Sequence, residues 1–126
     1  MPLLVPISVG ELLDKISILE IKADAISDPP KQANVMRELA ALEAVREREV
    51  AAMPELGALY AELRSVNRIL WQIEDDIREH ERDGQFDQRF IELARNVYRT
   101  NDCRAVVKRR INELSGSELV EEKSYV

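Results

Sequence analysis

A heptad seam between residues 54 and 82 constrains the fold of this chain more than any other feature. Leucine, valine and isoleucine recur there at alternating steps of three and four residues: Leu56, Leu59, Leu63, Val66, Leu70, Ile73 and Ile77. This spacing puts the side chains on one face of a long helix, as in a coiled coil. Such a face has to pack against another helix, so we expect a helical bundle.

Prolines and glycines divide the chain into four predicted helices. The pair Pro29-Pro30 ends the first helix, and Pro54 begins the third. Gly84 and Gly116 are placed to cap the third and fourth. The helices are predicted at about residues 8–26, 31–52, 54–82 and 86–115, with a short charged tail at 117–126. The sequence thus predicts one all-α domain over residues 1–126, an antiparallel four-helix bundle in which the last two helices form a long, coiled-coil-like hairpin.

The helix predicted at residues 8–26 has two apolar faces. It begins with a capping-box sequence, Ser8 to Glu11. Its main apolar face comprises Leu12, Ile16, Leu19, Ala23 and Ile26. Ile18 and Ile21 lie on the opposite side. Two arrangements stay open: the helix is central with neighbours on both flanks, or Ile18 and Ile21 contact a second chain in a homodimer or with a protein partner.

Polar side chains interrupt or flank the seams of the last two helices. The seam of residues 86–115 is apolar except at Thr100 and Arg104. In an antiparallel hairpin that turns at Gly84, polar stripes beside the two seams meet near its middle. The candidate ligand-binding residues are Asn67, Trp71, Glu74, Arg78, Arg95, Tyr98, Asn101, Arg104 and Lys108, with Lys15 and Lys22 of the first helix able to complete the site.

These polar residues allow two interpretations. A buried polar group without a partner costs about 1–3 kcal/mol, so they could satisfy one another in a closed network. The pairs in such a network would be Asn67 with Asn101, Glu74 with Arg95 or Arg78, and Asp102 with Arg99. Alternatively they form a pocket for a small anionic or polyhydroxylated ligand, in which Arg104 and Lys108 hold charge and Trp71 stacks. A helix break at Thr100 to Asp102 would also turn free backbone N–H groups toward an anion.

Charge and composition exclude several classes of protein. A net charge of −6 and a pI near 4.9 argue against nucleic-acid binding, although residues 95–110 are locally basic. No apolar run approaches the roughly 18 residues that a membrane-spanning helix requires. Cys103 is the single cysteine, and no stretch resembles a secretory leader. We therefore expect a cytoplasmic protein without a disulfide.

No catalytic motif is recognisable, so whether the chain is an enzyme stays open. The sequence has neither a phosphate-binding glycine loop nor a Cys/His metal cluster, and we expect no cofactor and no metal. His80 is expected on the surface, and Cys103 has no histidine near it. Carboxylate pairs one turn apart, Glu11 with Asp14 and Asp76 with Glu79, could hold Mg²⁺ as in all-helical nucleoside triphosphate pyrophosphohydrolases, although their order is reversed here.

Four blocks of sequence carry a resemblance to a known family. They are ELLDKISILEIK (11–22), LWQIEDDIR (70–78), FIELARNVYRTNDCRAVVKRRIN (90–112) and EEKSY (121–125). Together they resemble a family of small bacterial all-helical proteins of unknown function. The resemblance implies no activity and no catalytic residues. It also implies a setting near cell-surface polysaccharide or glycosyltransferase functions, which favours a sugar or nucleotide-sugar ligand.

Two functions are therefore carried forward. The first is a non-catalytic binding or protein-interaction module, dimeric through its first helix or its hairpin, with a mid-bundle polar site that favours an anionic or sugar-containing ligand. The alternative is a small enzyme acting on an anionic substrate of the nucleotide or nucleotide-sugar class, with or without Mg²⁺. In that case Glu74 would be the acid or base, and Arg104 and Lys108 would hold the charge of the substrate.

Overall fold

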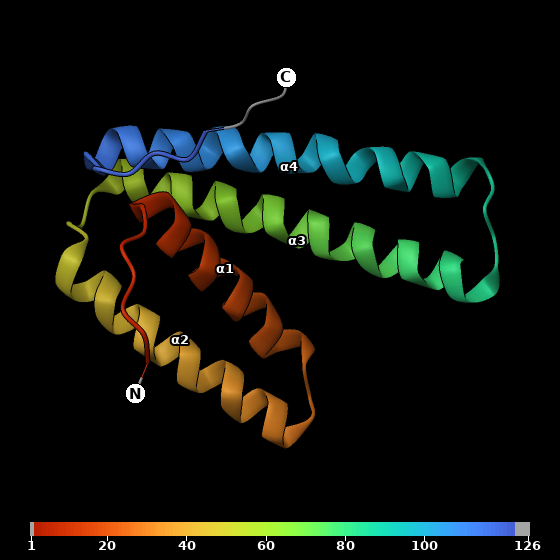
Figure 1. The fold of residues 1–126 in the computed structure, drawn as a ribbon, viewed down its shortest axis with the longest axis horizontal. Coiled ribbons are helices and arrows are strands. Elements are labelled where there is room, and N and C mark those ends of the chain that lie inside the picture. Colours follow the sequence, from red (N-terminus) through yellow and green to blue (C-terminus); the bar gives the residue numbers. More distant parts are fainter. Residues whose placement is uncertain (1, 123–126) are drawn as a thin grey trace.

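The computed structural model describes residues 2–122 and contains four α-helices (Figure 1). They are α1 (Val9–Ala25), α2 (Pro29–Glu49), α3 (Pro54–Asp83) and α4 (Gln88–Ser115). No strand occurs within the described residues, so the predicted all-α fold is confirmed. The last part of the predicted tail, residues 123–126, lies outside the described residues.

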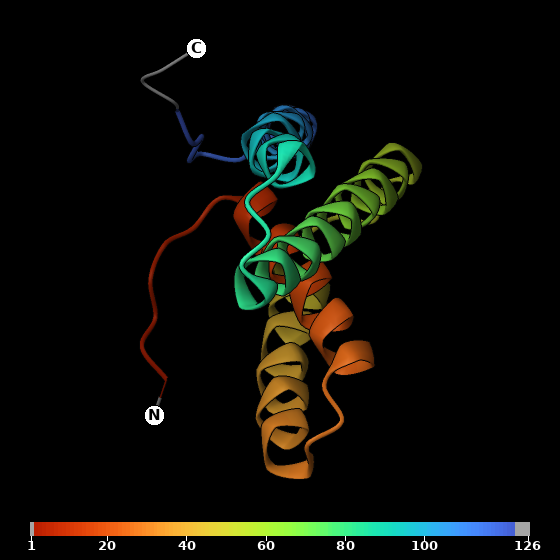
Figure 2. The ribbon, with the colours of Figure 1, turned by 90° about the vertical axis from the view of Figure 1, so that its right-hand side faces the viewer.

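The helices form two hairpins that cross obliquely. α3 and α4 run side by side over their whole length, and α1 with α2 lies at an angle to them (Figures 1 and 2). α1 contacts α2, α3 and α4, so it is the central helix. Because the α1–α2 hairpin diverges, the far half of the α3–α4 hairpin extends beyond it. The α1–α2 hairpin therefore covers only one half of the long hairpin, and α1 makes the contact.

Local sequence signals account for the helix ends. Ser8 Oγ accepts a hydrogen bond from the Glu11 amide at 3.0 Å and caps α1. Asp28 Oδ2 accepts from the Lys31 amide at 3.3 Å and caps α2, so α2 begins two residues earlier than predicted. Proline fits the first turn of a helix, where its missing N–H group is not needed. Gly84 (φ 65°) ends α3 in the left-handed conformation that glycine adopts without strain.

The apolar core lies where α1, α3 and α4 meet. Its fully buried members include Leu13 and Ile16 of α1, Leu63 of α3 and Ile111 of α4. α2 adds the partly buried Leu39, Leu42 and Val45. Among residues 2–122, no helix has both the length and the apolar character needed to cross a membrane.

The second apolar face of α1 is covered largely by the chain itself. Ile21 is only 3% exposed, whereas Ile18 is half-buried. This agrees with the central position of α1, which was one of the two arrangements expected. Contact of these isoleucines with a second chain stays a prediction. Because Ile21 is buried, only Ile18 is left accessible for such a contact.

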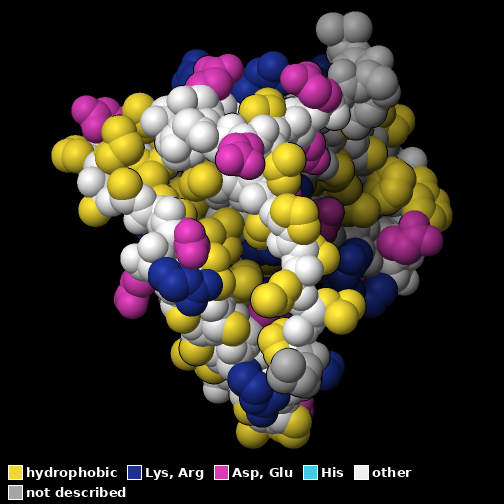
Figure 3. Space-filling model, turned by 60° about the vertical axis from the view of Figure 1, so that its left-hand side comes forward, with side chains coloured by type: hydrophobic (Ala, Val, Ile, Leu, Met, Phe, Trp, Pro, Cys, Tyr) yellow, Lys and Arg dark blue, Asp and Glu magenta, His cyan; other side chains and the backbone are white. Residues whose placement is uncertain are grey.

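Hydrophobic side chains also occur on the surface. Figure 3 shows them spread over one face, with basic and acidic side chains among them. The segment before α1 contributes Leu3 and Leu4, which are almost fully exposed. Single exposed apolar residues are common in folded proteins, so this distribution alone identifies no binding surface.

Candidate functional site

The candidate site is built around a buried carboxylate, that of Asp14 on α1. Its side chain is 1% exposed. Arg104 of α4 donates from Nε to Asp14 Oδ1 at 2.9 Å and from Nη2 to Oδ2. Asn67 of α3 donates from Nδ2 to Asp14 Oδ1 at 2.8 Å. One carboxylate thus joins three helices.

The hydrogen bonds to Asp14 keep it ionised in spite of its burial. Burial by itself would raise the pKa of the Asp14 carboxyl. The hydrogen bonds from Arg104 and Asn67, together with the positive charges of Arg104 and Lys108, outweigh that effect and hold the pKa below its ordinary value. The hydrogen bond to Asp14 in turn raises the pKa of the Arg104 guanidinium. Both partners are therefore charged at neutral pH.

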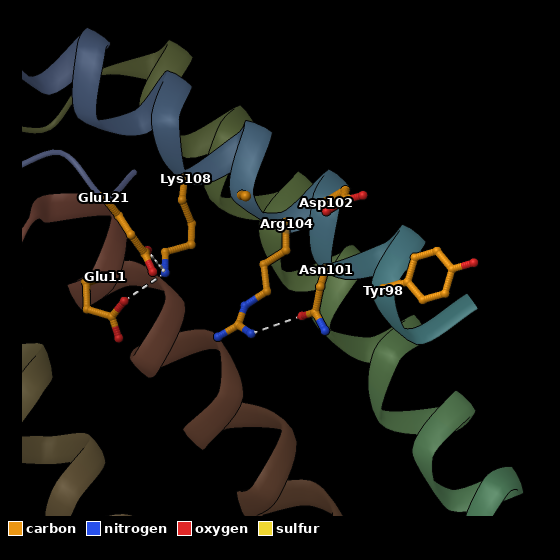
Figure 4. Close-up of a pocket in the computed structure, with 8 residues that line it drawn as sticks. Glu11, Tyr98, Asn101, Asp102, Arg104, Lys108 and Glu121 are labelled. Carbon is orange, nitrogen blue, oxygen red and sulfur yellow. Dashed lines mark hydrogen bonds and ion pairs between the residues drawn. The ribbon is translucent and has the colours of Figure 1, made fainter. Parts of the chain in front are cut away.

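Lys108, one turn after Arg104, is a second buried charge. Its Nζ lies 2.7 Å from Glu11 Oε2 and 2.8 Å from Glu121 Oε2 (Figure 4). Asp14 Oδ2 is 3.8 Å away. Burial lowers the pKa of Lys108, but the hydrogen bonds to Glu11 and Glu121 outweigh burial, and the net shift is upward. Glu121 belongs to residues 117–122, which we call the tail segment; this segment therefore returns to the helices.

Close backbone contact holds α1 against α4 beside these charges. The Gly10 amide donates to Asn112 Oδ1 at 2.7 Å. A Cβ atom on Gly10 would lie 2.7 Å from the Lys108 carbonyl oxygen and 2.9 Å from Asn112 Oδ1. Only glycine permits this approach without displacing the backbone of α4.

The side-chain amide of Asn67 is oriented by the two hydrogen bonds that its Nδ2 atom donates. Its Nδ2 also lies 2.7 Å from Ser17 Oγ, which donates to the Asp14 carbonyl oxygen at 2.8 Å. Asn67 Oδ1 is buried and has no hydrogen-bond partner among the described residues. The amide group therefore acts as a donor toward α1, which fixes the position of α3 relative to Asp14.

A polar cavity of about 400 Å³ opens beside this network. α4 supplies most of its lining, and α1 and the tail segment supply the rest (Figure 4). The lining residues are Glu11, Tyr98, Asn101, Asp102, Arg104, Ala105, Lys108 and Glu121. Asn101 Oδ1 accepts from Arg104 Nη1 at 3.3 Å, and Tyr98 is 55% exposed at the far side. The volume of the cavity lies within the range of sites that bind small molecules.

Comparison with known proteins places the chain in a family. The sequence model of the family of unknown function DUF6165 matches residues 3–126. The chain belongs to the DUF6165 family. No curated protein and no solved structure matches it. Three blocks singled out in the sequence, at residues 11–22, 90–112 and 121–125, contain the charged residues that meet in this DUF6165 chain.

The structure brings together only part of the predicted ligand-binding set. Arg104, Lys108, Asn101 and Tyr98 line the cavity, and Asn67 bonds to the same carboxylate as Arg104. The other six residues do not line the cavity. On α3 and α4, Trp71 is half-buried, and Glu74, Arg78 and Arg95 are exposed. On α1, the Nζ atom of Lys15 lies 3.7 Å from Glu11 Oε1, and Lys22 is half-buried near the end of the helix. A role of any of these residues in ligand binding stays a prediction.

Two of the pairs expected in a closed network are not found in the described part of the chain, and the pair of Asp102 with Arg99 stays a prediction. Asn67 bonds to Asp14 and Ser17, not to Asn101. Glu74 forms no salt bridge with any described residue. α4 runs without interruption through Thr100 to Asp102, so the helix break expected there is absent and α4 presents no free N–H groups at that point. The reason is the oblique path of α1, which brings Asp14 between Asn67 and Arg104 and supplies the partner that the hairpin helices were expected to supply to each other.

Sequence reasoning missed the central residue of the network. Asp14 was considered only with Glu11 as a Mg²⁺ pair, but these carboxylates instead bind Arg104 and Lys108. No group of three or more His, Cys, Asp or Glu side chains within residues 2–122 could hold a metal ion. A signal was present, since Asp14 lies on the same face of α1 as Ile18 and Ile21. A lone acid on an apolar face indicates a buried charged partner.

Proposed function

We propose that this DUF6165 protein is a non-catalytic binding module whose cavity between α1, α4 and the tail segment takes a small polar ligand with one anionic group. The observation that carries the proposal is the position of Lys108. Its ammonium group is nearly buried beside Arg104, yet one of its partners, Glu121, is a 63% exposed carboxylate on a non-helical segment. That carboxylate can be exchanged for one carried by a ligand.

The balance of charge in the site supports a ligand that replaces the Glu121 carboxylate rather than one that adds a further anion beside it. Three carboxylates, those of Glu11, Asp14 and Glu121, surround the two cations Arg104 and Lys108. A further anion in the closed site would meet an excess of negative charge. A ligand whose carboxylate takes the place of Glu121 leaves the balance unchanged, whereas a phosphate monoester adds up to about one further negative charge. Asn101 and Tyr98 can then accept from and donate to hydroxyl groups, which supports a sugar-containing ligand.

The same geometry gives less support to the enzyme alternative. Glu74, the expected acid or base, lies on α3 and does not line the cavity. Glu11 and Asp14 are each bound to a cation, which leaves neither placed to exchange a proton with a ligand. Binding without chemistry is therefore the function that we propose. The free, exposed thiol of Cys103 supports a reducing compartment such as the cytoplasm.

The proposal can be tested by NMR titration of ¹⁵N-labelled protein. The probes are glucuronate, glucose 1-phosphate and UDP-glucose, each with and without Mg²⁺, so that carboxylate and phosphate groups are compared. At least one probe should shift the side-chain resonances of Asn101 and Arg104. Glu121→Gln should tighten binding by about two- to fivefold, because a half-exposed ion pair worth up to about 1 kcal/mol no longer competes.

Matched variants separate the cavity from general charge effects. Asn101→Ala should weaken binding, whereas Arg95→Ala, an exposed change on the same helix outside the cavity lining, should not. Arg104→Ala is unsuitable as a control because it leaves Asp14 buried without its main partner. The proposal is wrong if no probe at millimolar concentration moves the cavity resonances in either wild type or Glu121→Gln.

A further inference from the structure

The face of the long hairpin that α1 covers continues uncovered beyond α1. On α4 this face follows one stripe at helical spacing: Ile91, Ala94, Tyr98, Asn101, Ala105, Lys108 and Asn112. Lys108 and Asn112 are buried against α1. Tyr98 and Ile91, earlier on the same stripe, are 55% and 48% exposed. The change from buried to exposed marks the point where α1 leaves the hairpin (Figure 1).

α3 continues the same face in the opposite chain direction. Asn67 binds Asp14 of α1, and Trp71, Glu74 and Arg78 follow it at steps of four, three and four residues. Trp71 is half-buried, while Glu74 and Arg78 are exposed. Neither of these charged residues forms a salt bridge with another described residue. The uncovered part of the face therefore combines aromatic and apolar groups with two charges that have no partner within the described chain.

We propose that two copies of this chain associate through this hairpin face, defined by Trp71, Glu74, Arg78, Ile91, Ala94 and Tyr98. The two α3 helices run antiparallel across a two-fold axis. This inference does not require a ligand, although the face shares Tyr98 with the lining of the cavity. Tyrosine and tryptophan are enriched in protein interfaces, and the apolar groups of the face match that composition.

The charges on the face are what indicate a second copy rather than another partner. Glu74 and Arg78 are four residues apart on one helix. In a two-fold antiparallel contact, Glu74 lies opposite Arg78 of the partner subunit, and the reciprocal pair forms by symmetry. The surface is thus complementary to itself, which is the requirement for an isologous dimer.

The length of the uncovered face fits the same arrangement. With Glu74 opposite Arg78 of the partner subunit, Asp83 at the end of α3 falls opposite Ile69 of the partner subunit. The last residue of α3 that α1 engages by a salt bridge is Arg68, 3.5 Å from Asp24. The α3 helix of the partner subunit therefore ends next to the stretch of α3 that α1 covers. The shared stretch of about 15 residues is about 22 Å long.

Sedimentation equilibrium of the full chain over a range of concentrations tests the dimer. Wild-type protein should dimerise, and the emission of Trp71, the single tryptophan, should shift to shorter wavelength as it does. Glu74→Lys should weaken the dimer about tenfold or more, since two attractive pairs become repulsive. Arg78→Glu should do the same, and the double variant Glu74→Lys/Arg78→Glu should restore wild-type affinity.

Glu62→Lys is the matched control, because Glu62 is an exposed acid on the side of α3 opposite Trp71. It should leave the dissociation constant unchanged. Circular dichroism of each variant checks that the helices are intact. A wild-type protein that stays monomeric overturns the proposal. So does a dimer that is indifferent to Glu74→Lys, or a double variant as weak as the single ones.

Discussion

The carboxylate of Asp14 and the guanidinium of Arg104, 90 residues apart in the sequence, lie face to face and share two hydrogen bonds. The bidentate geometry fixes both the distance between α1 and α4 and their relative register. Asp14 is buried completely, whereas Arg104 reaches it from the edge of the cavity. This ion pair thus links the core to the candidate binding site.

Removal of the Asp14 carboxylate should strongly destabilise the fold. Asp14→Ala leaves Arg104 and Lys108 without their shared partner, and breaking a buried pair from one side costs about 3–5 kcal/mol. Asp24→Ala is the matched control, since Asp24 also faces two arginines, Arg64 and Arg68, but is 66% exposed. It should cost less than about 1 kcal/mol. Urea denaturation measures both values, and equal losses would contradict the structural role assigned to Asp14.

Stability should also depend on the ionisation of Asp14 at acid pH. The folded state holds the pKa of Asp14 below 3.8, its value in an unfolded chain. Its contribution is therefore fully present above that pH and is lost as the pH falls through the folded-state pKa. The free energy of unfolding of wild type should fall more steeply below about pH 4 than that of Asp14→Asn. Asp75→Asn, an exposed change on α3, should follow the wild-type profile. Parallel curves for Asp14→Asn and wild type would speak against the buried ion pair.

The two alanine substitutions at Gly10 and Gly57 should have opposite effects. Gly10→Ala forces a methyl group to within 2.7 Å of the Lys108 carbonyl oxygen, and such overpacking costs about 1–3 kcal/mol. Gly57 lies inside α3 with open space around its Cα, so Gly57→Ala should stabilise by about 0.5–1 kcal/mol. Thermal unfolding gives both shifts. A neutral Gly10→Ala would mean that α1 and α4 are farther apart than found here.

The hydroxyl group of Tyr60 should contribute to stability through Glu20. Tyr60 donates to Glu20 Oε1, and Arg46 lies 4.4 Å from the centre of the Tyr60 ring. Burial, and after it the hydrogen bond to Glu20, raises the pKa of the phenol. Tyr60→Phe should cost about 1 kcal/mol, since the ring and its contact with Arg46 remain. Tyr98→Phe, at an exposed tyrosine, should change the melting temperature little. If both substitutions lowered the melting temperature equally, the hydrogen bond from Tyr60 to Glu20 would not be a stabilising contact.

Much of the fold was predictable because its signals are local. The heptad seam of α3, the prolines between helices and the glycine at position 84 each act within a few residues, and they predicted four helices and a long hairpin. The start of α2 was placed two residues late, since a proline that ends one helix can equally begin the next.

The site was predicted only in part because it depends on a crossing angle. Arg104 and Lys108 stood out as charges in or beside an apolar seam, and both are buried or partly buried against acids of α1. Asp14 could have been suspected from its place on an apolar face of α1, but its pairing with Arg104, and the part played by the tail residue Glu121, depend on the oblique path of α1 and of the tail segment. Trp71 and Glu74 were expected inside the bundle for the same reason, and they lie beyond the cover of α1 instead.

The partners of α1 also determine when this helix can become stable during synthesis. Gly10, Asp14 and Glu11 meet their hydrogen-bonding partners on α4, at positions between 104 and 112. A nascent chain that has left the ribosome only as far as the end of α3 leaves the α4-facing side of α1 exposed and Asp14 without Arg104. Stable folding should therefore wait until the last helix has emerged, and chaperones that recognise exposed apolar helices would have their longest opportunity before that point.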